Sequence, residues 1–167
     1  MQPPKHLTDP QQVVRMLQII VAALVSGVLM FAAVALSLSE RVAEMPMLGY
    51  VGLGFATIAI LVWSIVPAQI VATQRNQRVA RNEGAVAEAE LYQSFMTSRI
   101  VGNAVLEGAA FFNVIVYMSE GQWWSLAIVG LLLLMMLMNF PTRDRLDAFV
   151  AEQQALIQLD RDFSPRG

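Results

Sequence analysis

The chain has no cysteine and a single histidine, so the residues that most often serve as metal ligands or nucleophiles are nearly missing. The lack of cysteine excludes disulfides, thiolate catalysis, iron–sulfur clusters and cysteine-ligated zinc. The one histidine, His6, lies in a proline-rich N-terminal tail, whereas a metal site needs several convergent ligands. We therefore expect neither a metal site nor a cofactor.

Charge is also scarce, at 14% of the 167 residues, whereas a soluble domain carries about 25%. The net charge is −2 and no basic stripe is interleaved with aromatic residues, so nucleic-acid binding has no support. The chain also lacks a glycine-rich phosphate loop, a histidine-containing metal helix and a nucleophile with a base. We expect that the protein is not an enzyme and that a lipid bilayer is its solvent.

Apolar residues make up 56% of the chain and are gathered in four long blocks, which together contain a single charged residue. Each block can cross about 30 Å of hydrocarbon as a helix, which satisfies its own backbone in lipid. The sequence predicts an all-α membrane protein with four transmembrane helices and a C-terminal amphipathic helix. The predicted spans are residues 16–38, 47–73, 99–119 and 122–140. The predicted domains are a tail over 1–15, a transmembrane domain over 16–140 with a charged loop over 74–98, and an amphipathic helix and tail over 141–167.

The positions of Lys and Arg predict how these spans are oriented. With the N-terminus inside, ten basic residues are cytoplasmic and only Arg41 lies outside, in agreement with the positive-inside rule. Both termini and the charged loop are then cytoplasmic in a multi-pass protein of the cytoplasmic (inner) membrane. Alternatively, the first block is a cleavable signal peptide that ends near Ala35-Leu36-Ser37, although its apolar run exceeds the usual length.

One ionisable residue, Glu107, lies near the middle of the third block, which carries no other charge between Arg99 and Glu120. A charge at that depth costs about 3 kcal/mol even on a lenient insertion scale, so a functional role is the default hypothesis. Because hydrocarbon disfavours the ionised form, we expect a protonated Glu107 unless a cation or water is bound. Glu107 is therefore predicted to bind a proton or a monovalent cation.

Asn103 precedes Glu107 by one helical turn, so the two side chains are predicted to share a face and to interact. Small residues around them allow close packing with a neighbouring helix. Further polar residues that are candidates to support this pair are Gln69, Ser64 and Asn113. Asn113 is interpreted as an interhelical hydrogen bond. The alternative for Glu107 is a polar packing clamp, which contributes only about 0.6–2 kcal/mol in membranes.

The second block contains both glycines and a proline with expected structural roles. Gly49, Gly52 and Gly54 are predicted to allow close helix approach at one end of the span. Pro67 is predicted to kink the helix.

Two charged segments are candidates for contact with partners. Arg75, Arg78 and Arg81 are followed by the acidic residues Glu83, Glu88 and Glu90. Together they form either a solvated charged face or a docking site for a soluble partner. The segment over 141–167 has apolar residues at helical spacing. It is predicted to lie on the inner membrane face, or else to bind a partner or a second copy of the chain.

The stretch from Gly102 to Phe112 reads Gly-Asn-Ala-Val-Leu-Glu-Gly-Ala-Ala-Phe-Phe. Within residues 100–118 it resembles the second helix of the rotor-ring proteolipid (subunit c) of ATP synthases, which places a carboxylate mid-helix among small and apolar residues. The resemblance implies that Glu107 carries a proton or sodium ion and that the protein forms a multimeric ring. The chain departs from that family because its carboxylate is on the third of four helices, the preceding span lacks a dense glycine repeat, and an amphipathic segment follows.

Together these features favour a small polytopic membrane protein that binds a proton or monovalent cation at Glu107. Its expected partners are the bilayer and either other membrane subunits or further copies of itself. The alternative is a non-catalytic structural or assembly subunit in which Glu107 is a packing clamp.

Overall fold

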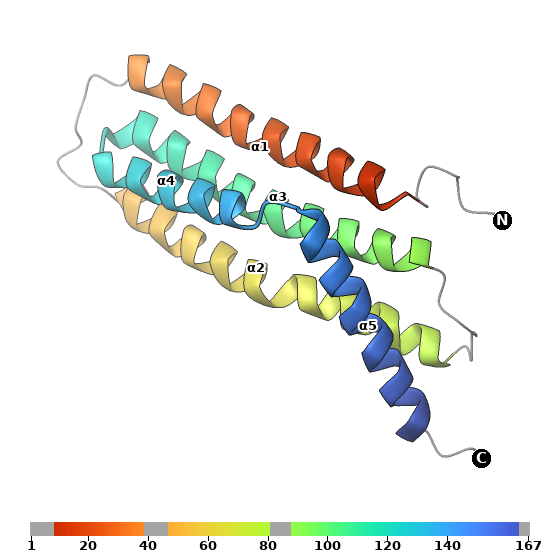
Figure 1. Ribbon diagram of the computed structural model, residues 1–167. Helices are drawn as coiled ribbons and strands as arrows, with labels where there is room; N and C mark the ends of the chain where they lie inside the picture. Colours follow the sequence, from red (N-terminus) through yellow and green to blue (C-terminus); the bar gives the residue numbers. More distant parts are fainter. Residues whose placement is uncertain (1–8, 39–46, 81–87, 164–167) are drawn as a thin grey trace.

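The computed structural model describes residues 9–38, 47–80 and 88–163, and these parts of the chain form five helices and no strand. The helices are α1 (Pro10–Leu38), α2 (Met47–Ala80), α3 (Glu88–Glu120), α4 (Trp123–Met138) and α5 (Arg143–Phe163). The first four run side by side as a bundle, whereas α5 turns away and crosses one end of it (Figure 1). The predicted all-helical class is confirmed.

Three helices, α1, α2 and α3, are each long and apolar enough to cross a membrane. A fourth span is obtained when α4 is taken together with α5, which is bent away from it by 68°. Alone, α4 has 16 residues and extends about 24 Å, which is less than the hydrocarbon thickness. Large apolar side chains such as Ile19 (64% exposed) and Met30 (73% exposed) cover the outside of the bundle, as expected where lipid is the solvent.

Helices α2 and α3 are longer than the spans predicted for them, so the segment between them is shorter than the predicted loop over 74–98. Residues 74–80 continue α2 and residues 88–98 belong to α3. From apolar residues at helical spacing after Gly84, the sequence predicts that the third helix starts near Ala85, which lies outside the described residues. The spans were predicted to end where the apolar residues end. The helical hydrogen bonding of α2 and α3 instead continues beyond the apolar residues into the charged segment.

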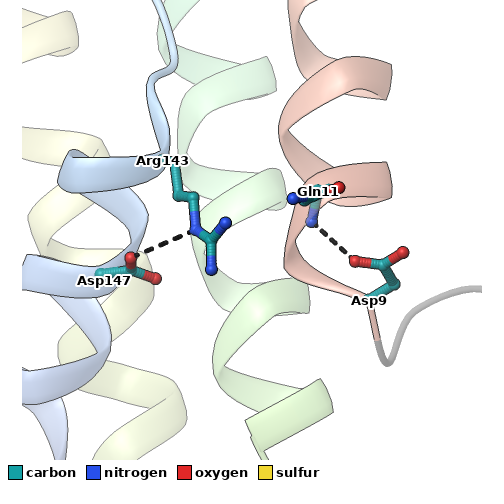
Figure 2. A network of polar contacts seen from close by, with 4 residues as sticks. All are labelled: Asp9, Gln11, Arg143 and Asp147. Atoms are coloured by element: carbon teal, nitrogen blue, oxygen red, sulfur yellow. Dashed lines mark hydrogen bonds and ion pairs between the residues drawn. The ribbon is translucent and has the colours of Figure 1, made fainter.

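The start of α1 is fixed by a local cap. Oδ1 of Asp9 accepts a hydrogen bond from the backbone N–H of Gln11 over 2.9 Å (Figure 2). Pro10 occupies the first helical position, where its missing N–H would have no partner in any case. At the start of α5, Nε of Arg143 lies 3.6 Å from Oδ2 of Asp147, an exposed pair one turn apart (Figure 2).

The start of α2 is capped by a residue from another helix. Oε1 and Oε2 of Glu120, at the end of α3, accept hydrogen bonds from the backbone N–H groups of Leu48 (2.7 Å) and Gly49 (2.8 Å). Glu120 is 5% exposed. The next residue, Gly121, has a positive φ of 68° and donates its N–H to the carbonyl of Tyr117, which ends α3 and turns the chain into α4. One carboxylate thus joins the ends of two spans.

The core is built around α3, which packs against α1, α2 and α4. Its middle buries Leu106, Ala109, Ala110 and Val114 against apolar residues of these helices. A second cluster lies at the end where α5 crosses, where Leu146 of α5 packs with residues of α1 and α3. The apolar face of α5 is therefore occupied, at least up to Leu146 and Phe149, by helices of the same chain.

Two of the three glycines in α2 permit the predicted close approach. A Cβ atom on Gly52 would lie 2.7 Å from Oδ1 of Asn113, and one on Gly49 would overlap the ring of Trp124. Gly54 has open space around it, so a packing role for Gly54 is wrong. The next residue, Phe55, instead contacts α3: its ring packs on the ring of Phe112, with the centroids 5.1 Å apart.

Candidate functional site

Glu107 lies in the middle of α3, between the turn that holds Asn103 and the turn that holds Phe111. Its side chain is partly exposed, and no hydrogen bond or ion pair joins it to any residue that the structure describes. Both Ala104 and Gly108 beside it are exposed, and the space next to Gly108 is open. The carboxyl group therefore has no polar partner within the described chain and lies beside a slim, open face of the bundle.

Asn103 does not bind Glu107. Its Nδ2 donates to the carbonyl of Arg99, one turn earlier on the same helix, over 3.0 Å. Its Oδ1 is buried without a hydrogen-bond partner in the described structure. An unpaired buried acceptor is uncommon and calls for an explanation, which the contacts among the described residues do not provide.

The supporting residues expected for Glu107 lie in three different places. Asn113 is fully buried, and its Nδ2 donates across the helix interface to the carbonyl of Gly52 (3.2 Å) as well as to Ala109 (2.9 Å). Asn113 thus makes the interhelical hydrogen bond predicted for it. Ser64 donates to Leu61 within α2, and Gln69 is exposed.

Of the three arginines predicted to dock a partner, the structure describes only the backbone of two. Arg75 and Arg78 belong to α2, but their side chains lie outside the described part. Arg81 lies in the segment 81–87, which is also outside it. A docking role for these residues stays a prediction.

A cavity of about 500 Å³, here called the Arg99 cavity, lies between α2, α3 and α5 at the end of the bundle that α5 crosses. Its wall includes two of the predicted site residues, Ser64 and Asn103. Glu107 does not line it. The structure therefore separates a polar cavity from the intramembrane carboxylate, which the sequence had suggested would form one site.

Arg99 is the basic residue that lines this cavity. In the sequence it was interpreted only as the residue that precedes the third span. Its Nη1 donates to Oδ1 of Asn139 at the end of α4 over 2.8 Å, and its guanidinium lies 5.1 Å from the ring centroid of Phe95. No described carboxylate pairs with it. In the connection between α4 and α5, the carbonyl of Pro141 accepts a hydrogen bond from Nε2 of Gln18 of α1 over 3.0 Å. Two polar side chains from α1 and α3 thus hold the bend between α4 and α5.

Within the described parts of the chain, no three His, Asp or Glu side chains lie close enough to hold a metal ion. No model of a known protein family, no curated protein and no solved structure matches the chain.

Proposed function

We propose that this is a small, multi-pass protein of the cytoplasmic membrane that binds a proton or a monovalent cation at Glu107 as part of a larger membrane assembly. In this proposal both termini are cytoplasmic, as the distribution of Lys and Arg predicts. The assembly consists of other membrane subunits or of further copies of the chain. No catalytic step is assigned to it.

The absence of a polar partner for Glu107 in the described chain is the observation that carries this proposal. A packing clamp within the chain requires a hydrogen bond to a neighbouring helix, such as the bond that Asn113 makes to Gly52. An unpaired carboxyl group in hydrocarbon is costly, so its partner has to come from outside: a proton, a cation, water or a polar group of another subunit.

The surroundings of Glu107 support a partner on the outer side of α3. The exposed residues on either side, Ala104 and Gly108, leave room for a second helix to approach closely. The resemblance of residues 100–118 to the carboxylate helix of the ATP synthase proteolipid supports the same role for Glu107 as an ion carrier. Asn103 and Ser64 line the Arg99 cavity, which Glu107 does not line, so the proposed ion site is reduced to Glu107 itself.

The experiment is ion uptake by proteoliposomes that contain the full chain with the subunits that co-purify with it in mild detergent. Glu107→Gln removes the ionisable group while it keeps the shape and is expected to abolish proton or sodium uptake. Asp147→Asn, an acidic residue exposed on α5, is the matched control and is expected to leave uptake intact. Uptake that is the same in wild type and Glu107→Gln would refute the ion-binding role.

The alternative is a non-catalytic structural or assembly subunit. It is favoured by the way this bundle uses other polar residues, because Glu120 and Asn113 both join helices. On this alternative Glu107→Gln is silent and the cytoplasmic segments hold the partner. Deleting residues 143–167, or replacing the arginines of the segment 74–98, then releases that partner in a pull-down from mild detergent.

A further inference from the structure

The Arg99 cavity contains two opposite charges that do not pair with each other. Arg99 of α3 and Glu152 of α5 both line it. No ion pair joins them, and neither pairs with another charged residue among the side chains the structure describes. Opposite charges that share a cavity of about 500 Å³ without contact leave room between them for a ligand that carries both signs.

The positive side of the cavity suits a phosphate. A guanidinium offers several N–H donors in a fixed plane, and only one nitrogen of Arg99 is used in its bond to Asn139. Arg145 lies near enough to act electrostatically on Arg99, so two like charges gather here. An anion bound to Arg99 at the cavity wall reduces this repulsion.

The negative side suits an ammonium group. Glu152 is exposed on α5 and lines the same cavity as Arg99, which belongs to α3. A ligand with a phosphate and an N–H-bearing ammonium a few bonds apart complements these groups.

We infer that the Arg99 cavity binds the phosphoethanolamine headgroup of a phospholipid, with the phosphate on Arg99 and the ammonium on Glu152. The lipid source follows from the apolar part of the wall, which includes Trp63, Val71 and Phe149. Arg99 also marks the end of the uncharged run of α3, the depth at which headgroups meet hydrocarbon. A soluble phosphoester would make no use of that apolar wall.

The test is native mass spectrometry of the purified full-length protein, titrated in detergent with phosphatidylethanolamine, phosphatidylglycerol or phosphatidylcholine of the same acyl chains. Wild type is expected to hold one phosphatidylethanolamine in preference to the other two lipids. Arg99→Gln keeps a side-chain N–H for Asn139 and is expected to weaken binding about tenfold or more, since charge-assisted hydrogen bonds are lost. Glu152→Gln is expected to abolish the preference for ethanolamine over glycerol.

Two further variants keep the test decisive if Arg99→Gln alters the fold. Ala72→Leu fills the cavity from α2 without touching either charge and is expected to displace the lipid. Arg143→Gln removes an arginine that lies outside the cavity and is expected to bind like wild type. Equal retention of the three lipids, or retention unchanged in both Arg99→Gln and Ala72→Leu, would overturn the site. Displacement by glycerophosphoethanolamine at concentrations similar to those of the lipid would overturn the lipid source.

Discussion

Glu120 at the end of α3 holds the first turn of α2 through Gly49, whose backbone N–H lies 2.8 Å from Oε2 of the carboxylate. The second oxygen binds Leu48 in the same turn. The two N–H groups have no intrahelical acceptor, and the positive end of the helix dipole favours a carboxylate there. The relationship joins two residues that are about 70 positions apart in the sequence, and it explains why a charged residue is buried at the edge of the bundle.

Replacing Glu120 by Ala is therefore expected to destabilise the protein. The loss of a helix cap costs about 1–2 kcal/mol, and a buried pair of unsatisfied N–H groups places the effect at the upper end. The measurement is the free energy of unfolding in a detergent titration. Ser119→Ala, an exposed neighbour whose hydroxyl bonds only within α3, is the control. Equal stability of the two variants would show that the cap contributes nothing.

The glycines of α2 offer a matched pair for testing the packing against α3. Gly52→Ala places a methyl group against Oδ1 of Asn113 and is expected to cost about 1–3 kcal/mol through overpacking. Gly54→Ala meets no atom within 4 Å and is expected to be neutral, or to stabilise the helix by up to about 1 kcal/mol, because alanine is the better helix former. The reverse order in the same unfolding assay would contradict the packing described for α2 and α3.

The position of α5 is tested by two leucines on the same helix. Leu146 is fully buried in the cluster with α1 and α3, whereas Leu159 is 57% exposed. Leu146→Ala is expected to cost about 2–5 kcal/mol and to raise the rate at which protease cleaves within α5. Leu159→Ala is expected to leave both the free energy of unfolding and the rate of protease cleavage near their wild-type values. If Leu159 proves the more sensitive residue, α5 is held by a membrane surface or a partner and not by its own bundle.

The fold class was readable because lipid imposes a simple rule: an uncharged run of about twenty residues has to be helical. The sequence also indicated the interhelical role of Asn113 and the close approach at Gly52, since a lone amide and a small residue have few other uses in hydrocarbon. The exact ends of the helices were not readable. Helices α2 and α3 continue into the charged segment 74–98 because hydrogen bonding does not depend on hydropathy.

Apart from the hydrogen bond of Asn113, the polar contacts between helices were not predicted from the sequence. Arg99 and Glu120 were used only to mark the ends of a span, yet one holds Asn139 and the other caps α2. Helical spacing placed Asn103 near Glu107, but it did not show that the amide would bond back to Arg99. Each of these contacts depends on which helix is the neighbour, and a pattern along one chain does not contain that information. A charged residue next to a glycine at a predicted helix end, as in Glu120-Gly121, was the available signal for the cap.

The chemical state of Glu107 in the membrane tests the central claim most directly. The measurement is labelling of the protein in intact membranes with a hydrophobic carbodiimide, which attacks protonated carboxyl groups in lipid, followed by peptide mass spectrometry. Glu107 is expected to be modified, with slower labelling at higher pH or in the presence of the bound cation. Glu120, which accepts two hydrogen bonds, serves as the internal control and is expected to stay unmodified. Failure of Glu107 to react under conditions that label other membrane carboxyl groups would contradict an unpaired, protonatable carboxyl group at this position.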